Sequence, residues 1–178
     1  MKSLTPMASA LAALCLSLAA CAQLPGSGDP GAIRSLADAQ RILGTPAMRW
    51  AKPDGGEQLA FPQGPMGYRT WMVHTDADGR VLSLENVMSM AHFARIQPGM
   101  SQDEVLRILG PSYPGWTVYY KARDELVWEW RYCDVWAEPA RFDVLFDGRS
   151  ATVRSTAGQP ERLSQPWGRG DRRDWCSP

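Results

Sequence analysis

The sequence predicts an α+β protein made of two tandem units, each with short helices packed on a three-stranded antiparallel sheet. One observation is a short helix with start and stop signals that occurs twice, at 35–44 and 101–110, and ends both times in Arg-Ile-Leu-Gly. The other is that strand-like runs follow each copy and meet at Asp-Gly-Arg, at 78–80 and 147–149. Asp-Gly between apolar runs indicates a tight hairpin, because that turn needs positive φ. The order of helix, strands and hairpin is therefore repeated.

Residues 1–20 have the pattern of an export signal. Lys2 precedes an apolar run from about residue 7 to 20, shorter than the roughly 20 apolar residues that a membrane-spanning helix needs. The run closes with Leu18-Ala19-Ala20-Cys21, which resembles the lipobox of bacterial lipoproteins. The resemblance implies cleavage before Cys21 and acylation, including palmitate, at that cysteine. Ala22, where Asp would favour inner-membrane retention, implies the periplasmic face of the outer membrane. A plain signal peptide cut elsewhere is the alternative.

Residues 21–31 are rich in Pro, Gly and Ser, and this composition predicts a tether between the anchor and a folded body. The whole chain has 19 basic and 19 acidic side chains, and removal of Lys2 with the signal leaves a net charge of −1. Such a balance provides no basic footprint for a phosphate backbone, so we expect no nucleic-acid partner.

The first unit is predicted to span residues 32–87. Its helix over 35–44 is the weaker copy, with Ser at the cap and an acid three residues later. Strand-like patterns follow at 58–61, 68–75 and 81–87. A connecting helix over 88–95 then leads into the second unit, which is predicted to span 88–156.

The helix of the second unit has the clearest signals in the chain. Ser101 is placed to cap it, and Glu104 can reach back to the Ser101 N–H, which makes a capping box. Gly110 supplies the C-cap and Pro111 prevents continuation. A helix of about two turns is unstable alone in water. We therefore expect its apolar stripe to dock on the strands that follow.

Strands of the second unit are predicted at 126–133, 141–146 and 151–155, with an extra extended piece at 117–121. The run from 126 to 132 alternates, so Glu129 and Arg131 lie on one face. The other face carries Leu126, Trp128, Trp130 and Tyr132. This aromatic face is either part of the core or an interaction surface formed by Trp128, Trp130 and Tyr132.

Cys133 and Cys176 are the two other cysteines of the exported chain. An oxidising compartment favours a disulfide between them, which would pin the C-terminal extension at 157–178 to a strand. The alternative is two unpaired thiols.

The segment 93–110 reads Phe-Ala-Arg-Ile-Gln-Pro-Gly-Met-Ser-Gln-Asp-Glu-Val-Leu-Arg-Ile-Leu-Gly. Following a lipobox, it resembles the SmpA/OmlA (BamE-like) family of outer-membrane lipoproteins. The resemblance covers residues 32–156 as two copies. It implies helices on a three-stranded antiparallel sheet, in a doubled form that resembles the β-lactamase inhibitor protein architecture, and a partner in the outer-membrane β-barrel assembly machine. We assign no partner-contacting residue of that family to a position in this sequence.

The residue types argue against an enzyme. His74 and His92 have no Cys, His or carboxylate at a metal-ligand spacing, and the chain has no Gly-x-Ser-x-Gly or phosphate-binding loop. We expect no catalytic residue, metal or cofactor. The expected function is a lipid-anchored periplasmic scaffold or accessory subunit, in outer-membrane β-barrel assembly or envelope integrity. The alternative is a periplasmic protein-binding, ligand-binding or inhibitor module that uses the sheet surface.

Overall fold

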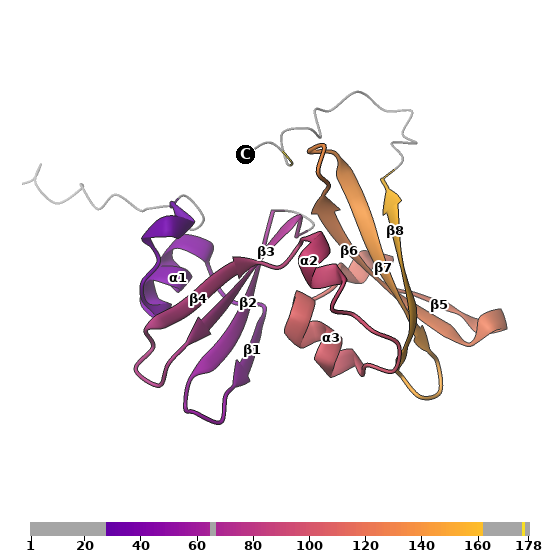
Figure 1. Cartoon of the computed structure of the whole chain (residues 1–178), viewed down its shortest axis with the longest axis horizontal. Coiled ribbons are helices and arrows are strands. Elements are labelled where there is room, and N and C mark those ends of the chain that lie inside the picture. Colours follow the sequence, from indigo (N-terminus) through magenta and orange to yellow (C-terminus); the bar gives the residue numbers. More distant parts are fainter. Residues whose placement is uncertain (1–27, 65–66, 162–175, 177–178) are drawn as a thin grey trace, which may run out of the picture.

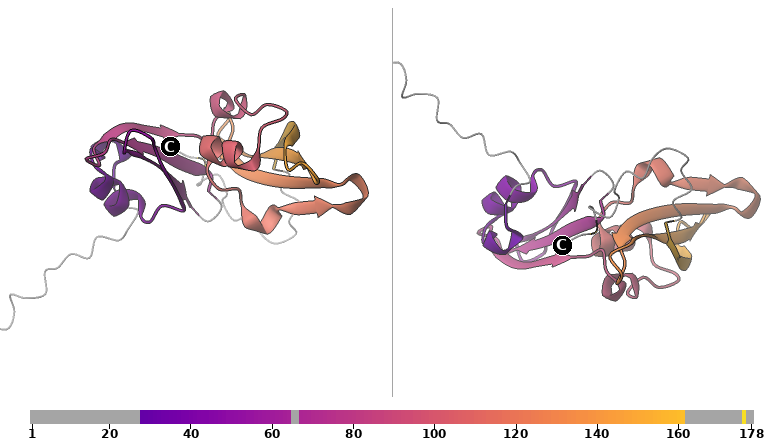
Figure 2. Two further views of the ribbon diagram at one scale, coloured as in Figure 1. Left: turned by 90° about the horizontal axis from the view of Figure 1, so that it is seen from below. Right: turned by 90° about the horizontal axis from the view of Figure 1, so that it is seen from above.

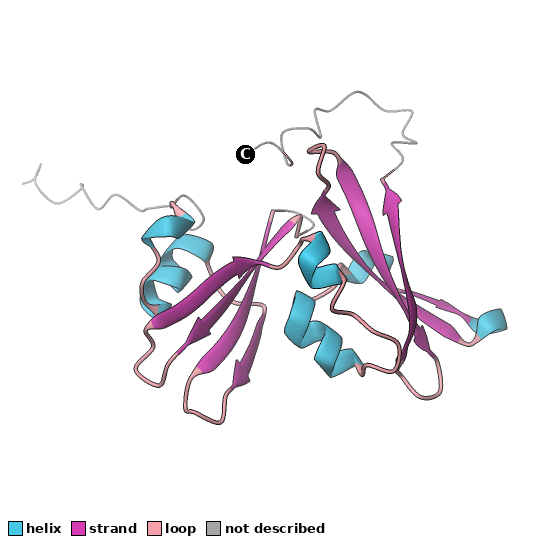
Figure 3. Ribbon diagram, in the orientation of Figure 1, coloured by secondary structure: helices cyan, strands magenta, loops and turns pink. Residues whose placement is uncertain are grey.

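The structure is a computed structural model that describes residues 28–64, 67–161 and 176. It contains two four-stranded antiparallel sheets with the strand orders β1-β2-β3-β4 and β5-β6-β7-β8. Short helices lie beside and between the sheets (Figures 1 and 3). The predicted three-stranded sheets are therefore wrong, although the antiparallel hairpins are present.

In the first sheet, the strand missing from the prediction is the edge strand β1. The strands are β1 (Met48–Ala51), β2 (Glu57–Gln63), β3 (Arg69–Thr75) and β4 (Val81–Asn86). All four residues of β1 pair with β2, from Met48 opposite Ala60 to Ala51 opposite Glu57. So short a strand shows too few alternations for the sequence pattern to reveal it.

The second sheet differs from the prediction at both edges. Its strands are β5 (Val118–Tyr120), β6 (Glu125–Cys133), β7 (Pro139–Asp147) and β8 (Val153–Pro160). The extra piece expected at 117–121 is thus a full member of the sheet. β8 continues past the predicted unit boundary at 156, and its residues after Val153 are exposed and polar or small, which leaves no apolar alternation to detect.

The main helices of the two units begin and end as predicted. The helices are α1 (Leu36–Leu43), α2 (Met90–Phe93) and α3 (Gln102–Leu109), with 3-10 turns η1 (Pro30–Ala32), η2 (Pro114–Trp116) and η3 (Lys121–Arg123). Both capping boxes are complete, with Asp38 serving Ser35 and Glu104 serving Ser101. The connecting helix expected over 88–95 is shortened to the single turn α2.

The repeat extends to the way each helix joins its sheet. Ser35 forms an isolated antiparallel bridge with Arg80, and Ser101 forms one with Thr152. In both units the cap residue therefore pairs with the chain just after the Asp-Gly turn, at the start of the last strand. This shared connection supports two copies of one structural unit.

The two copies are packed differently, because α3 lies between the sheets whereas α1 covers only the outer side of the first sheet (Figure 1). Ala39 and Ile42 of α1 belong to a cluster with Leu59 and Val73. The other cluster joins Val105 and Leu109 of α3 to both sheets, through residues that include Ala60, Met72, Trp130, Val144 and Phe146. α3 therefore joins both units in one core.

Gly110, at the C-terminal end of α3, lies against residues of both sheets. A Cβ atom there would be 3.0 Å from Thr70 Cγ2 and 3.1 Å from Ala60 Cβ of the first sheet. On the other side, the Trp130 Nε1–H of the second sheet donates to the Gly110 carbonyl oxygen at 3.2 Å. Gly44, its counterpart after α1, has no atom within 4 Å of such a Cβ.

Substitution of the two glycines should separate backbone strain from packing. Both have positive φ, 88° at Gly44 and 73° at Gly110, so alanine should cost each site about 1–3 kcal/mol. Gly110→Ala should cost about 1–3 kcal/mol more, because the new methyl group crowds the first sheet. Urea unfolding of the two variants measures the difference. Equal losses would show that α3 does not hold the sheets in close contact.

Candidate functional site

The outer face of the second sheet, away from α3, carries a cluster of charged side chains that are mostly buried. Alternation along β6 and β7 turns the apolar residues toward α3 and these charges outward, as predicted for Glu129 and Arg131. The register places Arg131 opposite Arg141 and Glu129 opposite Asp143. Glu161, directly after β8, completes what we call the charged cluster. Only 2% of Arg131 is exposed.

The cluster is held together by ion pairs and hydrogen bonds. Arg131 Nη2 lies 2.9 Å from Glu161 Oε1, and Arg141 lies 3.4 Å from Glu129 Oε2 and 3.7 Å from Glu161 Oε1. The side-chain amide of Gln159, on β8, donates to Asp143 Oδ2 at 2.8 Å. Three strands and the residue after them are thus linked across this face.

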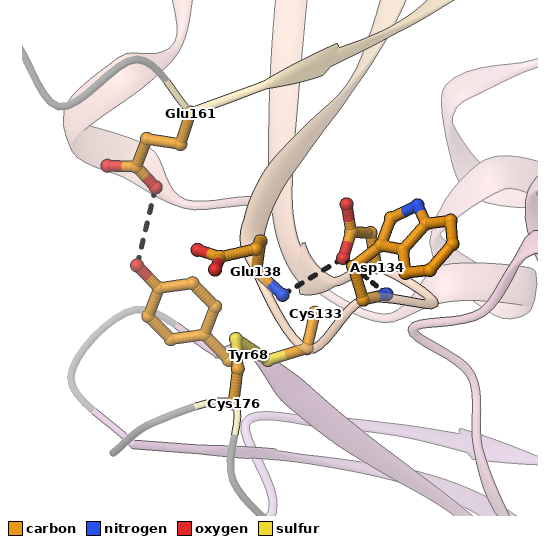
Figure 4. The surroundings of a disulfide bond; sticks show 7 residues. Tyr68, Cys133, Asp134, Glu138, Glu161 and Cys176 are labelled. Carbon is orange, nitrogen blue, oxygen red and sulfur yellow. Dashed lines mark hydrogen bonds between the residues drawn. A yellow bond between two sulfur atoms is a disulfide. The ribbon is translucent and has the colours of Figure 1, made fainter. Parts of the chain in front are cut away.

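Aromatic side chains from distant segments cover the cluster. The Trp116 ring of η2 lies 3.7 Å from Arg131 Cζ and 3.4 Å from Arg141 Cζ, measured to the ring centroid. At these distances the ring attracts both guanidinium groups. The Tyr68 hydroxyl, just before β3 in the first unit, donates to Glu161 Oε2 at 3.3 Å (Figure 4). The cluster therefore also ties the two units together.

Burial changes the pKa values of two carboxyl groups in this cluster. Removal from water raises the pKa of Glu129 to about 7, against the opposing effect of Arg141. Burial also raises the pKa of Asp143. A carboxylic acid that titrates near neutrality is typical of proton-transfer sites and of structural ion-pair networks. Here Glu129 is only 7% exposed and its partner Arg141 lies against Trp116, which favours a structural network whose strength depends on pH.

Among the described residues, no group of three or more His, Cys, Asp or Glu side chains could hold a metal ion. His92 lies instead beside Ser89 and Glu85, with His92 Nε2 3.2 Å from Glu85 Oε2.

The aromatic face of β6 belongs mainly to the core. Trp130 and Tyr132 are 2% and 8% exposed, and Tyr132 makes an edge contact with Phe93 of α2. Trp128 is partly buried and packs on Phe146. The structure thus favours the core interpretation, because α2 and α3 cover the positions proposed as an interaction surface.

Two other sites expose two or three apolar residues each, one on the edge strand β5 and one in the turn between β6 and β7. The first, which we call the tyrosine hairpin, comprises Val118, Tyr119 and Tyr120 of β5, the edge strand paired with β6. The Tyr119 hydroxyl donates to Asp124 Oδ1, and Arg123 Cζ lies 4.5 Å from the centre of the Tyr120 ring. The hairpin reaches the end of the molecule farthest from α1 (Figure 2).

The second site, which we call the tryptophan tip, is the turn between β6 and β7. Val135 and Trp136 are 84% and 81% exposed there. Asp134 Oδ1 accepts the backbone N–H groups of Trp136 at 2.8 Å and Glu138 at 2.9 Å. A disulfide joins Cys133, just before the turn, to Cys176 (Figure 4). The tip was not among the predicted site residues, although the adjacent Val and Trp inside a turn were the available signal.

Cys21 and its lipobox lie outside the described residues, as does most of the extension predicted at 157–178. Within the described part, no helix is both long enough and apolar enough to cross a bilayer. No family model, curated protein or solved structure matches the chain.

The charged cluster predicts that stability depends on pH through Glu129. Its folded pKa of about 7 exceeds its unfolded value of about 4.3, so the folded protein binds this proton more tightly. The Glu129 contribution to the free energy of unfolding should then fall as pH rises from about 4.5 to 7, by on the order of 3 kcal/mol. Glu129→Gln stays neutral and should remove this fall.

Urea unfolding of the wild type and Glu129→Gln at a series of pH values measures the effect as a difference between the two proteins. Glu138→Gln, at an exposed position, provides the matched control for loss of a surface carboxylate. The stability of Glu129→Gln relative to wild type should rise between pH 4.5 and 7 and then level off. A constant difference would contradict the role of buried Glu129.

Proposed function

We propose that the chain is an exported lipoprotein, anchored through Cys21 at the periplasmic face of the outer membrane. There it acts as a non-catalytic scaffold or accessory subunit in outer-membrane β-barrel assembly or envelope integrity. The anchor is supported by the lipobox resemblance at residues 18–21, and the assembly role by the resemblance of residues 93–110 to the SmpA/OmlA family.

The observation that carries the scaffold role is the tyrosine hairpin. Tyr and Arg are enriched in protein interfaces and dominate their binding energy. Tyr119 and Tyr120 are about half exposed, yet each is held by a neighbouring side chain, Asp124 or Arg123. Side chains that are already ordered lose less entropy when a partner binds. β5 is also an edge strand, which favours contact with another chain.

The closed charged cluster supports a non-catalytic role. Its arginines pair with Glu129 and Glu161 and lie against Trp116, so both guanidinium charges are balanced within the fold. Among the described residues, Arg131 Nη1 and Glu129 Oε1 are buried there without a hydrogen-bond partner. The same packing argues against the alternative of a binding or inhibitor module that uses a sheet surface. The first sheet has α1 and α3 on its two faces, and the second has α3 and the η2 segment. The hairpin ends are more accessible than these faces.

Cys21→Ser should move the protein from the membrane fraction to the soluble periplasmic fraction, because serine cannot receive the acyl chains. Fractionation of cells followed by immunoblotting measures this. Cys15→Ser, inside the signal, is the matched control and should leave the protein membrane-bound. Retention of Cys21→Ser in the membrane would contradict the lipoprotein assignment.

A photo-crosslinking amino acid at Tyr119 should capture barrel-assembly subunits in whole cells. The same label at Leu82, an exposed residue of β4, is the matched control and should not. Mass spectrometry identifies the captured chains. Capture of only a periplasmic enzyme, together with normal outer-membrane protein levels in a deletion strain, would refute the assembly role.

A further inference from the structure

We propose that the tryptophan tip is a second membrane contact, which inserts Val135 and Trp136 into the headgroup region of the bilayer that holds the lipid anchor. This inference rests on the proposed anchoring through Cys21. It assigns a function to a hairpin end distinct from the tyrosine hairpin.

The chemistry of the tip fits a membrane interface. Val135 and Trp136 are the two most exposed large hydrophobic residues of the described chain, at 84% and 81%, and the next is Met90 at 60%. Single exposed apolar residues are ordinary, but these two are adjacent at the end of a turn. Trp concentrates where membranes meet water, because its ring is apolar and its N–H is polar.

The tip is also fixed before it meets a bilayer. Asp134 Oδ1 accepts two backbone N–H groups of the turn, and Asp134 N donates to the Glu138 carbonyl oxygen at 2.9 Å. At the base of the tip Cys133 pairs with Pro139 of β7 and is also joined to Cys176 by the disulfide. Insertion therefore requires little further ordering of the backbone, which lowers its entropic cost.

The position of the tip favours the anchoring membrane over a separate partner. Residue 28, where the described structure begins, is seven positions from Cys21, so the chain between them spans at most about 25 Å. In Figure 1, η1 and the β6–β7 turn both lie toward the upper side of the molecule. The β1–β2, β3–β4 and β7–β8 turns lie toward the opposite side.

A tethered tip needs little affinity of its own. Attachment of a chain close to a surface makes the second contact intramolecular, and its effective concentration can reach the millimolar range. Two apolar side chains alone would give weak membrane binding, but weak binding is sufficient on a chain that the acylated cysteine already holds at the surface.

The charges around the tip indicate which lipid it meets. Asp134 and the exposed Glu138 flank the two apolar residues, and carboxylates are repelled by anionic headgroups. We therefore assign the tip to a zwitterionic lipid surface, with insertion shallow enough to leave both carboxylates in the aqueous headgroup zone.

The test uses residues 21–178 labelled with 5-fluorotryptophan and coupled through the Cys21 thiol to a maleimide lipid in zwitterionic phosphatidylcholine nanodiscs. The coupling supplies the tether whether or not cells acylate Cys21, so failure of the tip and failure of the anchor are distinguishable. Fluorine NMR resolves the tryptophans, and Trp136→Phe assigns the Trp136 signal. Trp130, which is 2% exposed, is the internal control.

On nanodiscs, the Trp136 signal should lose its broadening by a water-soluble paramagnetic agent and gain broadening from a spin-labelled lipid. The Trp130 signal should respond to neither agent. Val135→Ser, at an exposed position that should not affect folding, should partly restore the response of Trp136 to the water-soluble agent. Unchanged access of Trp136 to that agent would overturn the proposal. Protection in native envelope vesicles but not in nanodiscs that contain no envelope protein would also overturn it, since an envelope protein would then be the occupant.

Discussion

Burial of α3 between the two sheets is the interaction on which the rest of the structure depends. The helix has only eight residues, and so short a helix has no stability of its own in water. Its fully buried Val105 and Leu109 share one core with Ala60 of the first sheet and Val144 of the second. Hydrophobic contact on both sides therefore stabilises the helix and, at the same time, fixes the two sheets against each other.

Local signals were sufficient to predict the elements whose residues interact within a few positions. The capping boxes of Ser35 and Ser101 are read from neighbours three residues away, and the strands of the hairpins from period-two alternation. β1 was missed because it is only four residues long, and the length of β8 because its exposed residues are not apolar. Both differences fall at sheet edges. The absence of β1 from the prediction explains the three strands expected in the first sheet, whereas the fourth strand of the second sheet is β5, which was expected only as an extra extended piece at 117–121.

The candidate site also shows that local sequence signals do not predict contacts between distant segments. Alternation placed Glu129 and Arg131 on the outer face of β6, but it could not show that Trp116 and Tyr68 would cover them. Those contacts depend on how the two units pack, which no local pattern describes. The tryptophan tip was hidden for a different reason: turn residues have no periodicity, so the exposure of Trp136 is visible only once both flanking strands are in place.

The unequal packing of the two helices has a consequence for how the two copies can diverge over evolutionary time. α1 touches one sheet, and the space beside Gly44 is open. α3 touches two sheets, and Gly110 is enclosed by Thr70, Ala60 and Trp130. After a duplication, mutations would accumulate more freely in the helix with fewer neighbours. The packing of α3 against two sheets therefore constrains its sequence more strongly than the packing of α1 against one sheet.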